Sequence, residues 1–342
     1  MPVQSAPFTI DFALQGGGAH GAYTWGVLDR FLQEPGLRVD GISGTSAGAM
    51  NAVVLADGYA EDGAEGARAA LERFWRRVSE AALFSPLRRS PLDVLLGRWT
   101  LDYSPSYLAF DFAARLVSPY DLAPVAFNPL REVLEQSVDF ERLVASKVRL
   151  FVTATNVRTG RGRVFRNAEL NPDVLLASAC LPTLFQAVEI DGDPYWDGGY
   201  SGNPTITPLV RDCRCSDVVL VQINPVEREG GAPRGAREIQ NRLNEVSFNA
   251  CLLKELRMIA LMRSLDDPGR GECARWAGMR IHRVASAALG GLGYSSKLNA
   301  EWAFLCMLRD EGRRSADAFL KAHRQDIGKR STLDLDTYLE GI

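Results

Sequence analysis

The stretches FTIDFALQGGGAHG at residues 8–21 and LRVDGISGTSAGAM at residues 37–50 decide the fold of this chain. Each begins with a run that predicts a buried strand, and each continues through glycines into a helical pattern. Two such strand–turn–helix units within the first 60 residues favour an α/β protein with a parallel sheet.

The rest of the chain predicts further strands, helices and turns. The Asp191–Gly192 pair between two short apolar runs indicates a type I′ hairpin. The Gly- and acid-rich residues 57–66 indicate a surface loop. The other predicted strands are 148–155, 164–165, 187–190, 194–196, 218–223 and 279–285, and the other predicted helices are 23–33, 67–82, 173–180, 237–263, 297–310 and 316–324.

Composition excludes several classes of protein. With 342 residues, 46% of them hydrophobic, the chain is too apolar to be disordered. Its net charge of −3 lacks the excess of basic residues that is typical of nucleic-acid-binding proteins. Residues 1–9 lack Lys and Arg and no long uncharged apolar run occurs, so neither a signal peptide nor a transmembrane helix is expected. We therefore predict a cytoplasmic protein that meets membranes only peripherally, at the inner face. The sequence gives no indication of oligomeric state.

The cysteines and histidines do not predict a metal site. Six cysteines in a chain of this length are no disulfide framework, and the Cys213-x-Cys215 pair alone is a weak metal motif. We expect neither a metal nor a cofactor.

The first chemical motif is Gly44-Thr45-Ser46-Ala47-Gly48, a G-x-S-x-G pattern. Between a predicted strand and a predicted helix, it fits a nucleophile elbow, in which glycines at both ends permit a sharp turn. The hydroxyl of Ser46 would then stand at the positive end of a helix. The simpler alternative is an ordinary turn in which Ser46 caps the helix.

The second motif is the glycine run that begins at Gly16, and it supports two interpretations. Gly16, Gly18 and Gly21 match the dinucleotide-binding fingerprint, with Asp40 about 20 residues on as the ribose-binding acid. A second glycine-lined turn that carries a serine has no use in such a fold.

The alternative use of the glycine run is an oxyanion hole. Successive glycines expose backbone N–H groups at a helix start, aimed at developing negative charge. In this interpretation Gly16, Gly17 and Gly18 form the hole together with Ala47, the residue after Ser46. Two neighbouring turns would then form one site at the carboxyl ends of the strands.

The third motif is WDGGYSGNP at residues 196–204, and it raises the question of which base activates Ser46. Asp197 either makes a turn or reaches Ser46 as a base, for which burial would have to strengthen it. Among the three histidines, only His20 adjoins a motif, whereas His282 and His323 are expected to be structural.

Together these motifs resemble the patatin-like phospholipase family: a glycine-rich anion hole at 16–21, an elbow at 44–48 and an Asp-Gly-Gly motif at 197–199. The resemblance implies a three-layer α/β fold with a central mixed, mainly parallel sheet over residues 9–210. Residues 211–342 would be a C-terminal extension that adds the last sheet strands and helices packed on the core.

The same resemblance implies the roles of the site residues. Ser46 would be the nucleophile and Asp197 the base, with no histidine. The amides of Gly17, Gly18 and Ala47 would be the oxyanion donors. The remaining motif positions would support the site: His20, Gly21, Gly44, Gly48, Gly198 and Gly199. The family usually carries Arg or Lys at the position of His20, so a fixed positive charge is lost there.

We therefore expect a serine acyl hydrolase of lipid carboxylic esters, phospholipase A-like or lysophospholipase-like. The motifs do not separate it from a thioesterase, an acyltransferase or a hydroxyalkanoate-oligomer esterase that uses the same dyad. A dinucleotide-binding protein is the alternative from another class. The aromatic, proline-rich residues 83–129 are either an acyl-binding wall or interfacial surface, or an irregular packing layer.

Overall fold

The sheet is the centre of the molecule in this computed structural model, which describes residues 7–122, 128–228 and 231–340. Within these residues eight strands form one sheet, in the order β5-β6-β3-β2-β1-β7-β8 with β4 paired to β3. The pairs β1–β2, β2–β3, β1–β7 and β7–β8 are parallel, and the pairs that join β3 to β4, β3 to β6 and β5 to β6 are antiparallel. The strands are β1 (Phe8–Leu14), β2 (Leu37–Gly44), β3 (Arg149–Asn156), β4 (Gly162–Arg166), β5 (Val188–Ile190), β6 (Asp193–Asp197), β7 (Asp217–Val221) and β8 (Arg280–Val284).

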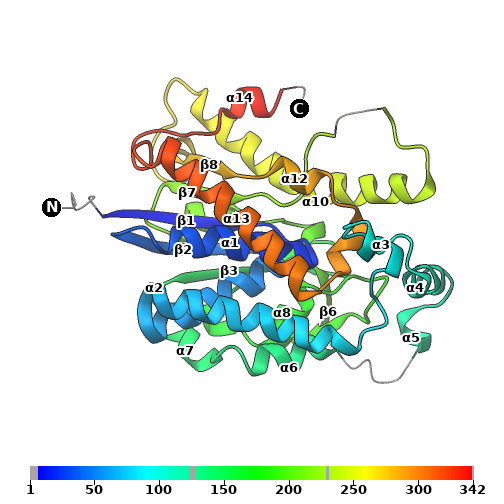
Figure 1. Cartoon of the computed structure of the whole chain (residues 1–342). Coiled ribbons are helices and arrows are strands. Elements are labelled where there is room, and N and C mark those ends of the chain that lie inside the picture. The colour runs from blue at the N-terminus through cyan, green and yellow to red at the C-terminus, as the bar shows by residue number, and fades with distance from the viewer. Residues whose placement is uncertain (1–6, 123–127, 229–230, 341–342) are drawn as a thin grey trace.

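Helices cover both faces of the sheet (Figure 1), which confirms the predicted α/β fold with a mixed, mostly parallel sheet. The helices are α1 (Gly21–Phe31), α2 (Ala47–Ala81), α3 (Pro91–Leu95), α4 (Pro105–Leu116), α5 (Pro119–Leu122), α6 (Pro129–Glu135), α7 (Phe140–Val144), α8 (Pro172–Ser178), α9 (Thr207–Asp212), α10 (Ala236–Arg263), α11 (Glu272–Gly278), α12 (Ala287–Gly290), α13 (Trp302–His323) and α14 (Leu335–Tyr338). Of the helices described, none is long and apolar enough to cross a membrane.

Strand β1 shows how the sheet separates two hydrophobic cores. Side chains alternate between the faces of a strand, so Ile10, Phe12 and Leu14 join the core under α1, α2 and α13. Ala13 points the other way, into a smaller core with residues of α9, α10 and α14. This double burial explains why the strand reads as a continuous apolar run.

The residues after 210 are part of the same sheet. β7 lies directly beside β1, and β8 extends that edge. Helix α13 packs along α1, where the rings of Phe31 and Phe319 lie 6.0 Å apart and Arg313 pairs with Asp29 at 2.8 Å. The residues after 210 therefore complete the core around this sheet.

Two predicted boundaries were wrong. Residues 57–66 are not a loop: α2 continues through them, and only Asp62 and Gly63 leave helical geometry, at a kink. The predicted helices 297–310 and 316–324 are instead a 3₁₀ turn, η5 (Tyr294–Leu298), and the single helix α13. In α13 charged helix formers carry the helix through Gly312 and Ser315. In α2 the break does occur at Asp62 and Gly63, and a second helical segment follows it directly.

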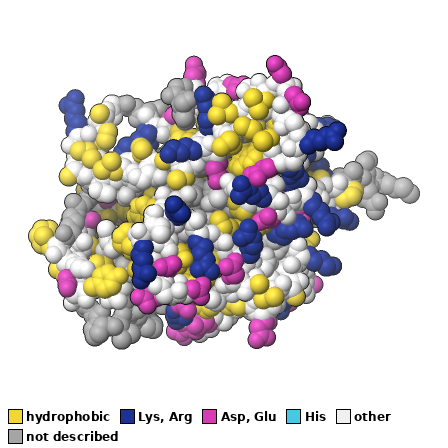
Figure 2. Space-filling model, turned by 180° about the vertical axis from the view of Figure 1, so that it is seen from behind, with side chains coloured by type: hydrophobic (Ala, Val, Ile, Leu, Met, Phe, Trp, Pro, Cys, Tyr) yellow, Lys and Arg dark blue, Asp and Glu magenta, His cyan; other side chains and the backbone are white. Residues whose placement is uncertain are grey.

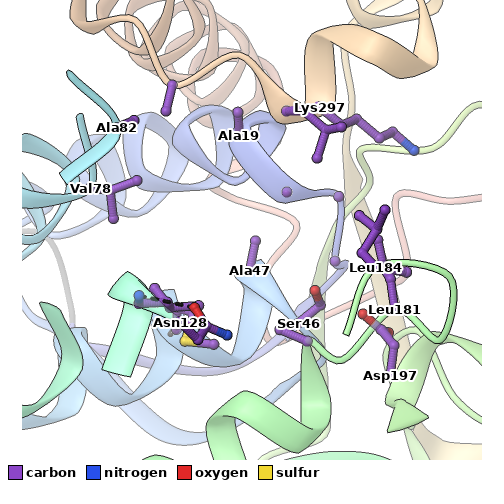
Figure 3. A pocket seen from close by; sticks show the side chains of 18 of the residues that line it. Ala19, Ser46, Ala47, Val78, Ala82, Asn128, Leu181, Leu184, Asp197 and Lys297 are labelled. Carbon is purple, nitrogen blue, oxygen red and sulfur yellow. Dashed lines mark hydrogen bonds between the residues drawn. The ribbon is translucent and has the colours of Figure 1, made fainter. Parts of the chain in front are cut away.

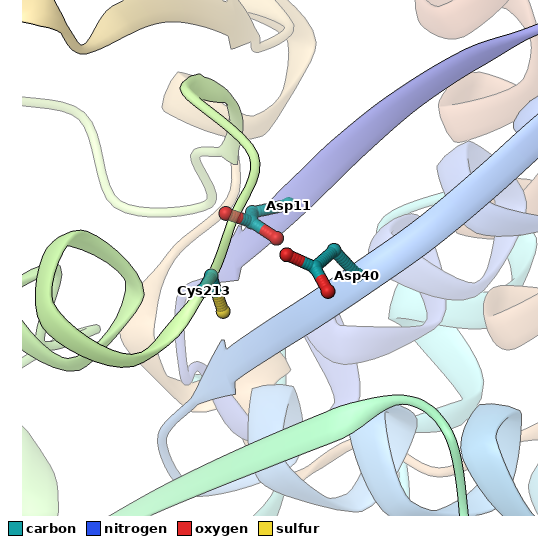
Figure 4. A group of neighbouring side chains, drawn as sticks. All are labelled: Asp11, Asp40 and Cys213. Atoms are coloured by element: carbon teal, nitrogen blue, oxygen red, sulfur yellow. The ribbon is translucent and has the colours of Figure 1, made fainter.

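A buried acidic cluster lies on the face of β1 and β2 toward the smaller core, where Asp11, Asp40 and Cys213 meet (Figure 4). Their possible ligand atoms lie within 4.8 Å of one another, a spacing that could suit a metal ion. The oxygens of Asp40 are already used, however, because Arg149 donates to one and the backbone amides of Arg214 and Cys215 donate to the other. Burial and the nearby Asp40 charge raise the pKa of Asp11 to about 8, so Asp11 holds a proton at neutral pH.

We expect Asp11→Asn to remove a pH-dependent loss of stability. Asp11 is fully buried and neither of its oxygens accepts a hydrogen bond of normal geometry, so its ionised form is disfavoured in the folded state. Because its folded pKa is raised, the contribution of Asp11 to the free energy of unfolding is greatest below pH ~4 and is lost as pH rises toward 8, with a slope of at most about 1.4 kcal/mol per pH unit. Chemical denaturation of Asp11→Asn between pH 4 and 9 should give a flatter curve. The exposed Asp62→Asn should keep the wild-type slope, and equal slopes for all three proteins would contradict the assignment.

Candidate active site

Two glycine-bearing turns meet at the carboxyl ends of β1 and β2. Leu14 and Gly44 are register partners in this parallel pair, so the chain leaves both strands at the same edge of the sheet. The turn after β1 leads through η1 (Gly18–His20) into α1, and the turn after β2 leads directly into α2. Neighbouring strand ends are thus the reason why residues 16–18 and Ser46 share one site.

Ser46 occupies a strained turn at the start of α2. Its φ of 54° and ψ of −124° are rare for a residue with a side chain, as a nucleophile elbow requires. The amide of Ser46 donates to the hydroxyl of Ser178 at 2.9 Å, and that hydroxyl donates to the Thr153 carbonyl at 2.7 Å. The Ser46 side chain makes no capping hydrogen bond, so the simple N-cap interpretation does not hold.

Asp197 ends β6 and lies beside Ser46 at the cavity wall (Figure 3). Its side chain is 2% exposed, and one carboxylate oxygen accepts the Gly199 amide at 2.7 Å. Burial raises the pKa of Asp197 to about 7, against smaller lowering effects of the Gly199 amide, the Ser46 side chain and Lys297. The carboxylate is therefore a much stronger base than an exposed aspartate.

The glycine turn supplies amides, but not all of those predicted are unengaged. The N–H of Gly16, which we predicted as part of the oxyanion hole, donates to the side-chain oxygen of Asn203 at 2.7 Å. Across the described residues, the amides of Gly17, Gly18 and Ala47 donate to no protein acceptor. Three unengaged amides at two helix starts can bind an anionic oxygen.

Close packing explains why the turn needs glycine. A Cβ on Gly16 would lie 2.7 Å from the Cβ of Ser46, and one on Gly18, whose φ is +57°, would lie 2.4 Å from the Lys297 carbonyl oxygen. The other motif glycines are buried against neighbouring atoms in the same way, namely Gly21, Gly44, Gly48, Gly198 and Gly199.

A network of side-chain amides that sequence reasoning missed holds the glycine turn. Gln15 donates to the Asn203 carbonyl and to the Asn249 side chain, and its oxygen accepts the amides of Ile223 and Asn224. Asn224 in turn donates to the Gly16 carbonyl at 2.9 Å. With residues 15–16 themselves, the network joins four separate segments, and no local pattern could have linked them.

His20 is buried beside the turn rather than beside Ser46. Its Nε2 lies 2.8 Å from the hydroxyl of Ser296, and its ring contacts Phe304 edge-on. Burial, and secondarily Lys297, lower the pKa of His20 to about 3, so the imidazole is neutral. His282 and His323 contact Asp217 and Asp326, away from the site.

The reactive groups open into a cavity of about 380 Å³ whose walls are mainly apolar. One wall is helix α2, and part of another comes from residues 179–185 after α8. Lys297, which sequence analysis did not single out, also lines it. The apolar lining includes Met50, Phe74, Trp75, Val78, Ala82, Leu130, Val133, Leu181, Leu184 and Phe248.

Asp40 does not join the glycine turn. It lies mid-strand in β2, four residues before Gly44, and is held by Arg149 and backbone amides. Four strand residues span roughly 13 Å. The structure therefore separates the residues on which the dinucleotide interpretation depends.

Comparisons with known proteins bear on the family of this chain. The profile of the patatin-like phospholipase family matches residues 12–210. A cGAMP-activated phospholipase of Pseudomonas aeruginosa is 33% identical over 205 residues, which cover 56% of this chain and 52% of that protein. The chain thus spans about half the length of this curated relative. A crystal structure of VipD from Legionella pneumophila aligns with 93% of this chain and 67% of its own, at 15% identity and a TM-score of 0.38.

Proposed function

The chain belongs to the patatin-like phospholipase family, and from that premise we propose that it hydrolyses lipid carboxylic esters with a Ser46–Asp197 dyad. The observation that carries the proposal is the meeting of three features in one cavity. These are a serine in a strained elbow, a buried carboxylate with a raised pKa, and three unengaged amides at helix starts. An apolar cavity of about 380 Å³ suits an acyl chain.

The reaction would follow from the positions of these groups. The Ser46 oxygen attacks the ester carbonyl while its proton passes to Asp197, and the Gly17, Gly18 and Ala47 amides stabilise the tetrahedral oxyanion. The intermediate collapses to an acyl-enzyme, and the alcohol leaves with the proton from Asp197. Asp197 then takes a proton from water, which attacks the acyl group and releases the fatty acid as Ser46 regains its proton.

A substrate panel tests this function directly. Turnover should be measured with a phospholipid, a lysophospholipid, an acyl-CoA and a short-chain p-nitrophenyl ester, with Ser46→Ala as the blank. Preference for the first two supports the phospholipase assignment, whereas preference for acyl-CoA would favour a thioesterase. A wild-type protein that cleaves none of the four would contradict the proposal.

We further propose that helices α3, α4 and α5, with the connection between α3 and α4, form a lipid-contacting surface beside the cavity. Their large apolar side chains are exposed on the side of the molecule away from the N-terminus (Figure 2). Tyr120 in α5 accepts the Ala187 amide, next to the cavity-lining residues 184–185. Residues 123–127 of the segment 83–129 lie outside the described residues. The surface consists of Leu92, Val94, Leu95, Leu96, Tyr103, Leu108, Phe112, Leu116 and Tyr120.

Charges placed on this surface should weaken membrane binding and spare soluble-ester hydrolysis. Leu95 and Phe112 are 81% and 65% exposed, so Leu95→Asp with Phe112→Asp disturbs little packing. We expect at least a tenfold loss of sedimentation with phosphatidylcholine vesicles and less than a threefold change with p-nitrophenyl butyrate. Val144→Asp in α7, at 57% exposure, is the matched control. An equal loss of vesicle binding in both variants would rule out a specific lipid-contacting surface.

A further inference from the structure

The cavity contains two charged side chains among its described lining residues, Asp197 and Lys297. Asp197 belongs to the proposed dyad. Lys297 comes from η5, about 250 residues after Ser46, and has no part in the reaction described above. A cation in a mainly apolar cavity is costly unless it is paired or hydrogen-bonded.

Among the described residues Lys297 makes no direct ion pair: Glu245 and Asp197 act on its charge only from a distance, and its Nζ lies 5.4 Å from the centroid of the Tyr294 ring. Its Nζ donates to the side-chain oxygen of Asn224 at 2.6 Å, a neutral partner. With the carboxylates of the described residues it forms no ion pair, since Glu245 is paired with Arg228 and Arg242. An ammonium has three donors, so hydrogen-bonding capacity remains for a ligand.

Lys297 lies against the glycine turn, and its amine lies in the same cavity as Ser46. Its backbone closes over the glycine turn, since a Cβ on Gly18 would lie 2.4 Å from the Lys297 carbonyl oxygen. In Figure 3, Val78 and Ala82 of the apolar wall lie on one side of Ser46, and the Lys297 amine lies toward the other. In this view the α2 wall and the Lys297 amine therefore lie on different sides of Ser46, with Leu181 and Leu184 on the side of Lys297.

We propose that Lys297 forms an anion subsite that binds the phosphate of a glycerophospholipid whose acyl chain lies along α2. This inference rests on the proposed ester hydrolysis at Ser46. In a glycerophospholipid the phosphate and the scissile ester share one glycerol, so an ester at Ser46 with its chain toward Val78 brings the phosphate to the opposite side.

The electrostatics of Lys297 fit this task. Burial lowers its pKa to about 8, while Glu245 and Asp197 partly oppose that shift, so the amine is still mostly charged at pH 7. An incoming phosphate would restore the stability of the charged form. The carboxylate of a released fatty acid has similar chemistry and is the competing ligand for the same amine.

The test compares Lys297→Met with wild type and Lys297→Arg, using ligands that cannot be hydrolysed. Equilibrium binding of hexadecylphosphocholine should weaken at least tenfold in Lys297→Met and should be largely rescued in Lys297→Arg. Binding of hexadecylglycerol, which lacks the phosphate, should change less than threefold. Palmitate is the third ligand, and a loss confined to palmitate would assign the subsite to a carboxylate and overturn the proposal.

Kinetic measurements on two substrates, with and without a phosphate, distinguish the anion subsite from the proposed ester hydrolysis. With dihexanoyl phosphatidylcholine, Lys297→Met should raise KM at least tenfold more than it does with dihexanoylglycerol. Equal losses on both substrates, mainly in kcat, would make Lys297 a positioning residue that acts through Asn224 on the glycine turn. If wild type bound the phosphate-bearing ligand selectively but cleaved neither substrate, the proposed hydrolysis would fail while the anion subsite stood.

Discussion

Ser46→Ala should reduce ester hydrolysis to the uncatalysed background, a loss of about 10⁴-fold or more in kcat. The Ser46 side chain interacts with the buried Asp197 carboxylate and lines the same cavity as the three unengaged amides, so we expect no neighbour to take its place. Covalent labelling by a fluorophosphonate should disappear in parallel, because the probe needs the same activated oxygen. Both are measured on purified protein, with p-nitrophenyl butyrate as the substrate.

A second serine in the same cavity provides the matched control. Ser85 lines the cavity, and its hydroxyl accepts the Leu87 amide in a local turn, away from the dyad. Ser85→Ala should keep labelling and turnover within about threefold of wild type. Persistent labelling of a folded Ser46→Ala protein, judged by an unchanged melting temperature, would place the nucleophile elsewhere.

The parts of the fold that were predictable carry short-range signals. The two strand–turn–helix units were recognisable in the sequence because apolar runs end at glycines. The β5–β6 hairpin was recognisable because Asp-Gly pairs favour the positive φ of a type I′ turn, and Asp191 and Gly192 do both have positive φ. Helix α2 was cut short because Asp62 and Gly63 do break helical geometry, but only locally, and the helix resumes beyond them. A sequence pattern registers the break and not the tertiary packing that carries the helix past it.

The candidate site likewise contains residues that a local motif reveals and residues that only tertiary packing brings together. Ser46 and Asp197 could be proposed because each sits in a motif with its own turn chemistry, although their separation of about 150 residues hides the contact. Nothing in the sequence near Gly16 reveals that Asn203 accepts its amide. Lys297 stands alone in a 3₁₀ turn, and only the packing of η5 on the glycine turn brings it to the cavity.

The pH dependence of the wild-type enzyme follows from the burial of Asp197. A general base works only when deprotonated, so a pKa of about 7 predicts that kcat/KM rises roughly tenfold per pH unit below pH 7 and levels off above it. Activity rises with pH, and not the reverse, because burial favours the protonated, inactive form of Asp197. An unperturbed aspartate would place the same limb near pH 4.

Asp197→Asn should abolish the rise of kcat/KM below pH 7 together with most of the activity. The amide keeps the size of the side chain and an oxygen for the Gly199 N–H, yet it cannot take the Ser46 proton. We expect kcat/KM to fall by about 10³–10⁴-fold, at the upper end of what a general base contributes, with little change in melting temperature. Initial rates with p-nitrophenyl butyrate between pH 5 and 9 measure both effects.

His20→Ala is the variant that decides between a dyad and a histidine-dependent mechanism. The His20 imidazole bonds Ser296 and is held neutral by burial, so its removal should lower the melting temperature by leaving a void. It should reduce kcat/KM less than tenfold and leave the limb near pH 7 in place, because that limb belongs to Asp197. If instead His20→Ala lost the limb and Asp197→Asn kept it, the proton would pass to the imidazole, and the carboxylate would have only a structural part.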